Sequence, residues 1–103
     1  MKFKVLFLKE AQDDFAESRN WYRKINPSLS ARFTKDFKET IKSIQENPNK
    51  YQIRYDNNRV RLLRKFPYLI HYSIENDIVL IKALFHTSRD HRNWKIRNNN
   101  QNE

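Results

Sequence analysis

The sequence of 103 residues contains neither glycine nor cysteine. Without cysteine there is no disulfide framework and no thiol chemistry, which fits a reducing compartment. Without glycine there is no Walker-type or dinucleotide-binding phosphate loop, because these loops need backbone that lacks a Cβ. Asparagine tolerates left-handed backbone better than most residues, so we expect asparagine to form the turns instead.

Long apolar runs are also missing. No stretch of about 18 apolar residues is present that could form a transmembrane helix, and the apolar positions near the N-terminus are too few and too interrupted for a signal peptide. We therefore expect a cytoplasmic protein that does not contact membranes. The length suits one domain with one modest core. We assign residues 1–94 to that domain and the polar, asparagine-rich residues 95–103 to a disordered tail.

Acidic residues are outnumbered, since the sequence has 21 lysines and arginines but 12 aspartates and glutamates, which gives a net charge of +9. Positive charge is densest in two segments, with Arg59, Arg61, Arg64 and Lys65 in the first and Arg89, Arg92, Lys95 and Arg97 in the second. A field of this sign attracts phosphates or an acidic protein. The alternative is a solvated charged surface that only keeps the protein soluble.

Hydrophobic periodicity predicts the order of the elements. Residues 2–8 alternate like a strand, residues 10–23 and 28–46 have the spacing of amphipathic helices, and residues 59–66, 68–74 and 78–85 are strand-like, as is the short alternating stretch 51–55. Asn26 and Pro27 suit the cap and first turn of the second helix. The predicted fold is α+β in the order β-α-α-β-β-β, a helical hairpin on a mostly antiparallel twisted sheet. We expect Trp21 in the hairpin core and Trp94 against the sheet.

Four stretches, taken in order, resemble the RelE/ParE superfamily of toxins. They are the helix ending in Trp21-Tyr22, the helix that opens with Ala31-Arg32-Phe33 and ends at Asn47-Pro48, the block from Val60 to Tyr72, and the stretch from Leu84 to Asp90 with Trp94 behind it. The resemblance implies the toxin of a type II toxin–antitoxin system, also known from plasmid stabilisation, which inhibits growth and is neutralised by a cognate acidic antitoxin. It implies no cofactor. RelE-like members cut messenger RNA on the ribosome, whereas ParE-like members inhibit DNA gyrase.

A metal-independent nuclease needs a base, an acid and cations that hold the scissile phosphate. The resemblance points to His86 and Arg89 as catalytic residues in that case. Cations that could bind phosphate, or the antitoxin, are Arg59, Arg61, Arg64, Lys65 and Arg92. Tyr68 or Tyr72 could stack on a nucleobase. His71 is either a second base candidate or an ordinary half-buried sheet residue, the role of His91 stays open, and no histidine spacing supports a metal site.

One departure from the family pattern favours gyrase over RNA as the target. The RNA-cutting members carry an arginine directly after the aromatic residue that opens the penultimate strand, and here Leu69 follows Tyr68. Residues 61 and 65 also differ from residue 64 in strand parity, so at most two of these three cations can face one pocket. We therefore prefer a ParE-like inhibitor that contacts gyrase through the helical hairpin, with ribosome-dependent messenger RNA cleavage as the alternative. A non-toxic nucleic-acid-binding module is the second alternative.

Overall fold

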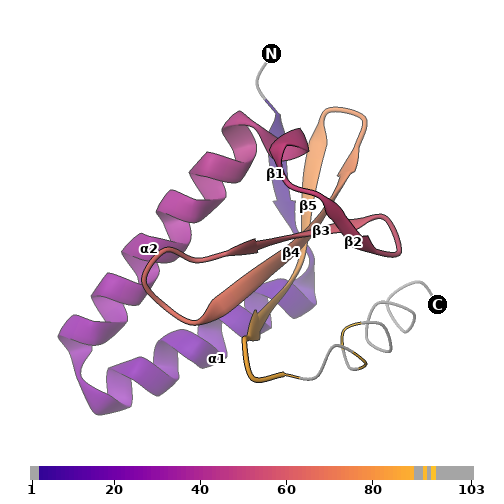
Figure 1. Ribbon diagram of the computed structural model, residues 1–103. Coiled ribbons are helices and arrows are strands. Elements are labelled where there is room, and N and C mark those ends of the chain that lie inside the picture. Colours follow the sequence, from indigo (N-terminus) through magenta and orange to yellow (C-terminus); the bar gives the residue numbers. More distant parts are fainter. Residues whose placement is uncertain (1–2, 90–91, 93, 95–103) are drawn as a thin grey trace.

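A computed structural model describes residues 3–89, 92 and 94. Its elements are β1 (Lys4–Phe7), α1 (Lys9–Ile25), α2 (Pro27–Glu46), the 3-10 turn η1 (Pro48–Lys50), β2 (Ile53–Tyr55), β3 (Asn58–Leu62), β4 (Tyr68–Glu75) and β5 (Ile78–His86). The strands form one sheet in the order β1-β5-β4-β3-β2, in which β1 pairs parallel to β5 and the other pairs are antiparallel (Figure 1). The predicted α+β order is confirmed. The predicted tail, residues 95–103, lies outside the described residues, and so does His91.

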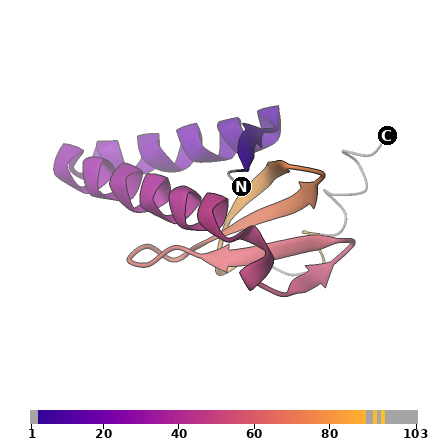
Figure 2. The ribbon, with the colours of Figure 1, turned by 90° about the horizontal axis from the view of Figure 1, so that it is seen from above.

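The two helices form one layer and the sheet forms the second (Figure 2). The main core lies between these layers, where Phe33 and Ile44 of α2 meet Ile70 and Tyr72 of β4. A smaller cluster lies on the other face of the sheet, where Trp94 packs on Phe85 and Ala83. Trp94 is 4% exposed, so the prediction that it docks against the sheet is confirmed.

Local chemistry explains the ends and turns of the elements. The Asn26 side chain accepts a hydrogen bond from the Ser28 N–H at 2.8 Å, which confirms it as the cap of α2. The turns that join β2 to β3 and β4 to β5 use left-handed backbone at Asp56, Asn57 and Asn76. Asparagine and aspartate thus occupy the positions for which glycine is the usual choice. Within the described residues, no helix has both the length and the apolar character needed to cross a bilayer.

Two predictions about packing are wrong. Trp21 is 62% exposed rather than part of the hairpin core. The strand predicted at 59–66 ends at Leu62, because the N–H groups of residues 64–66 bond to the buried Asp36 carboxylate instead of a neighbouring strand. Arg64 and Lys65 therefore lie in the β3–β4 loop, where strand parity does not set the direction of their side chains.

Candidate functional site

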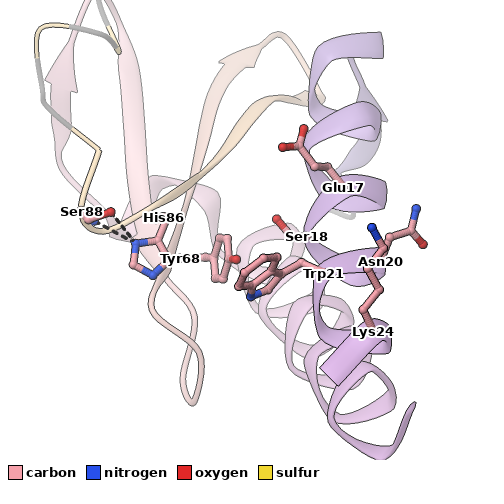
Figure 3. A pocket seen from close by; sticks show the side chains of 8 residues that line it. All are labelled: Glu17, Ser18, Asn20, Trp21, Lys24, Tyr68, His86 and Ser88. Atoms are coloured by element: carbon pink, nitrogen blue, oxygen red, sulfur yellow. Dashed lines mark hydrogen bonds between the residues drawn. The ribbon is translucent and has the colours of Figure 1, made fainter. Parts of the chain in front are cut away.

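A cleft separates the middle of α1 from the end of β5, and we call it the α1–β5 cleft. It is lined by Glu17, Ser18, Asn20, Trp21, Lys24, Tyr68, His86 and Ser88. Figure 3 shows Tyr68 between His86 and Trp21, with Glu17 projecting from α1 into the same space. An adjoining hollow shares many of these residues and adds Asp14, Leu84 and Arg89. Asp14 also accepts a hydrogen bond from the Leu84 N–H at 3.0 Å, which ties α1 to β5 beside the cleft.

His86 is held at the mouth of this cleft by its own turn. Its Nδ1 accepts the Ser88 N–H at 3.1 Å and lies 2.8 Å from the Ser88 hydroxyl oxygen. The centres of the His86 and Tyr68 rings are 5.2 Å apart, and the two rings are nearly perpendicular. An acceptor Nδ1 places the proton of a neutral imidazole on Nε2. In that state neither ring nitrogen is free to take a proton from a ribose hydroxyl, so the arrangement does not favour His86 as a general base.

Arg89 is close to His86 in the chain and lines the same adjoining hollow. Its N–H donates to the His86 carbonyl at 3.0 Å, while its guanidinium carbon lies 4.3 Å from the centre of the Phe85 ring. Phe85 belongs to the cluster around Trp94, and His86 contacts Tyr68 of the main core. Arg89 therefore lines the hollow beside His86 while its guanidinium stacks on Phe85, a residue of the opposite face of β5.

Arg59 and Arg61 form a different site near the other edge of the sheet, with Lys50 and Tyr51, which we call the Tyr51 cluster. Arg59 donates to the Tyr51 carbonyl, and the Arg61 guanidinium carbon lies 5.0 Å from the centre of the Tyr51 ring. Burial by itself would raise the pKa of Tyr51, but the hydrogen bond with Ser43 and the positive charges of Arg61 and Lys50 bring that pKa below its ordinary value. The cluster is therefore a strongly electropositive surface.

Arg64 and Lys65 are displayed by the loop that Asp36 holds, and both are exposed. The Asp36 carboxylate accepts the N–H groups of Arg64, Lys65 and Phe66 at 3.2, 2.8 and 3.0 Å. The Lys65 side chain borders a hollow with Arg32 and Lys35 of α2. Arg92 is exposed as well.

Of the predicted cations, Arg89 lines the hollow beside His86, but Arg61, Arg64 and Lys65 do not converge on it. Arg61 is paired with Ile70 of β4, and β4 separates it from β5, which places the backbones of β3 and β5 about 10 Å apart. Neither hollow at His86 is lined by Arg61, Arg64 or Lys65, whereas the carboxylates of Asp14 and Glu17 line the hollow beside it. Carboxylates at this position repel a scissile phosphate.

The two tyrosines considered for base stacking are both enclosed. Tyr72 has no exposed surface, and its hydroxyl donates to the Pro48 carbonyl at 2.7 Å, so its ring cannot meet a nucleobase. Tyr68 is 7% exposed and supplies only the floor of the α1–β5 cleft. His71 is fully buried rather than half-buried, with its Nδ1 2.9 Å from the Tyr55 hydroxyl. No group of three or more possible metal ligands occurs in the described part of the chain.

Three residues that matter for these sites were not identified from the sequence. Asp36 was not singled out on α2, and Glu17 and Trp21 of α1 were not predicted to line a cleft. A signal was available for Asp36, because it lies one position before Phe37 of the apolar stripe and close to the buried face of the helix.

Comparisons with known proteins agree with this fold. Residues 5–91 match the model of the family described as ParE toxin of type II toxin-antitoxin system, parDE. A solved structure titled "Chromosomal ParDE TA system from P. aeruginosa" superposes with a TM-score of 0.75 at 15% identity, covering 84% of this chain and 98% of that chain.

A second solved structure, the isolated E. coli RelE toxin, superposes with a TM-score of 0.58 at 14% identity, covering 94% of this chain and 97% of that one. At these identities the superpositions establish the fold alone. No curated protein matches the sequence significantly. The family model spans most of the chain, and the protein therefore belongs to the ParE toxin family of type II toxin–antitoxin systems.

Proposed function

We propose that this toxin inhibits growth by binding DNA gyrase, as the ParE-like branch does, and not by cutting messenger RNA. The observation that carries the proposal is the composition of the site around His86. Carboxylates of Asp14 and Glu17 line it together with Arg89, while Arg61, Arg64 and Lys65 lie elsewhere. A surface in which one arginine lies against two carboxylates, and which has no available base, suits protein recognition better than RNA cleavage.

The cognate antitoxin, on this proposal, is an acidic protein that covers the electropositive side of the toxin. The Tyr51 cluster is the best-defined binding site for the antitoxin's carboxylates, because Arg59 and Arg61 are held in place by contacts with Tyr51. Guanidinium groups that are already held in position lose little conformational freedom when they bind a carboxylate. Opposite charges would also speed the encounter of the two proteins.

The test is inducible expression in a bacterial host, with RNA 5′-end mapping and plasmid supercoiling measured in the same culture. Under the proposal, supercoiling changes or gyrase-linked DNA breaks appear while messenger RNA stays intact. The His86→Ala and Arg89→Ala variants should then remain toxic. New cuts within translated codons, lost in both variants although they fold normally, would refute the proposal in favour of a RelE-like nuclease. Growth without inhibition would instead favour a non-toxic nucleic-acid-binding module.

A further inference from the structure

The outer surface of α1 carries an apolar pair beside an unpaired carboxylate. Trp21 and Ile25 are 62% and 60% exposed, and they lie one helical turn apart on the same side of α1. Glu17 is one turn before Trp21 and is also exposed. Within the described part of the chain Glu17 forms neither an ion pair nor a side-chain hydrogen bond. An exposed tryptophan is uncommon on a surface that contacts only water, and its position at a cleft points to a binding role.

The charge of this spot differs from that of the chain as a whole, because its carboxylates balance its cations. Glu17 lines the cleft and, with Asp14 and Arg89, the adjoining hollow, where the Arg89 guanidinium stacks on Phe85. Among the described residues, Lys24 is the one lysine or arginine that lines the α1–β5 cleft itself. A +9 protein thus presents a concave surface of carboxylate, indole and Tyr68 (Figure 3). This combination suits a cation and not a phosphate.

An arginine side chain matches these groups in shape and charge. A guanidinium plane can stack on the face of an indole, and its N–H groups can at the same time reach a carboxylate. Residues four positions apart on a helix have Cβ atoms about 5–6 Å apart, so one guanidinium can contact both Trp21 and Glu17. Apolar atoms next to that arginine would cover Ile25.

The sign of the charge at each surface also indicates which of two partners, the antitoxin or the protein target, binds there. An antitoxin that neutralises a +9 toxin supplies carboxylates, and those fit the Tyr51 cluster and not Glu17. We infer that the surface formed by Glu17, Trp21 and Ile25 receives an arginine-bearing segment of the toxin's protein target. This inference rests on the proposed function, since it takes gyrase as that target.

The decisive experiment measures inhibition of purified gyrase in a supercoiling assay and antitoxin binding by calorimetry. We expect Trp21→Ala and Glu17→Gln to raise the half-inhibitory concentration about tenfold or more, because stacking and ion pairing at a desolvated contact are lost. Trp21→Phe should restore part of the inhibition. The matched control is Glu75→Gln, the same substitution at an exposed residue of the hairpin between β4 and β5, and it should match the wild type. Antitoxin affinity should stay unchanged in all four variants.

Two results would overturn the inference while the wild type still inhibits gyrase. One is full inhibition by both Trp21→Ala and Glu17→Gln. The other is an equal loss of antitoxin binding, which would assign the surface to the antitoxin. Misfolding of the variants is not expected, because Trp21 is largely exposed.

If the wild-type toxin does not inhibit gyrase, the proposed function fails and a second measurement decides the inference. The ¹⁵N-labelled toxin is titrated with N-acetyl-arginine amide and with the neutral N-acetyl-citrulline amide. A shift of the Trp21 indole N–H with the arginine probe alone, absent in Glu17→Gln, supports a guanidinium site. Equal responses to both probes, or none to either, overturn it.

Discussion

Asp36 holds the β3–β4 loop in place from the middle of α2, and its removal should be costly. The side chain is 3% exposed, and its carboxylate accepts three consecutive backbone N–H groups at 2.8–3.2 Å. Asp36→Ala leaves these donors without their partner. A hydrogen bond to a charged group contributes about 1.5–3 kcal/mol, but the partly buried loop can relax and hydrate some of its donors. We expect a loss of about 3–5 kcal/mol in the free energy of unfolding.

Urea denaturation of the wild type and the variants measures this loss directly. Asp36→Asn keeps one acceptor oxygen and should fall between the wild type and Asp36→Ala. The matched control is Asp13→Ala, since Asp13 makes a single exposed ion pair with Lys9 at 3.1 Å, and such a pair contributes about 0.5 kcal/mol or less. Amide hydrogen exchange at Lys65 and Phe66 should accelerate only in the Asp36 variants. If Asp36→Ala stays within about 1 kcal/mol of the wild type, the three bonds do not hold the loop and the reasoning is refuted.

Three further substitutions test the packing. Burial raises the pKa of Tyr72 from 10.0 to about 12, so the stability that its neutral form contributes is complete below pH 10 and is lost as pH rises through 12. Tyr72→Phe should weaken that alkaline loss in urea titrations and cost about 1 kcal/mol at neutral pH, through the bond to Pro48. Trp94→Ala should lower the free energy of unfolding by about 3 kcal/mol, because it leaves a cavity beside His71, whose ring centre lies 4.5 Å from that of Trp94. Asn26→Ala should cost about 1 kcal/mol through loss of the α2 cap. If a substitution lowers the free energy of unfolding by less than half of the expected value, the contact assigned to it does not make the expected contribution.

Features set by local sequence were predictable. The Asn26-Pro27 pair marks the start of α2, and the turn at Asn76 has the left-handed backbone that asparagine tolerates. The apolar stripe of α2 correctly indicated which side of the helix is buried, with Phe33 and Phe37 in the core. These signals act within a few residues of the chain, so they need no knowledge of the tertiary structure.

Features set by contacts between distant residues were not predictable. The strand pattern through residues 63–66 is overridden by Asp36, about 30 positions earlier in the sequence. Trp21 was placed in the core because it adjoins Tyr22, but neighbours on a helix differ by about 100° in direction. Tyr22 accordingly packs on Phe33 while Trp21 is exposed. Hydrophobicity alone does not reveal which of two adjacent aromatic residues faces the partner layer.

The direction of His86 depends on one irregularity in the sheet. Tyr72 pairs with Ile81 and His71 pairs with Ala83, so Lys82 is an extra residue in β5. Before it, Val79 and Ile81 face the helices, and after it Leu84 and His86 do. Regular alternation from Ile81 would turn Phe85 toward the helices and His86 away from them, so His86 would not lie beside Tyr68 and α1.

The bulge instead places His86 beside Tyr68 and the carboxylates of α1, in a hollow that Arg89 also lines. Because the apolar run of β5 is nearly continuous, its sequence gives no sign of this change of face. The same ordered motif can therefore stand beside the helices or on the opposite face of the sheet. A motif match at His86 and Arg89 is thus insufficient evidence for nuclease chemistry, because the register of β4 and β5 decides which groups surround His86.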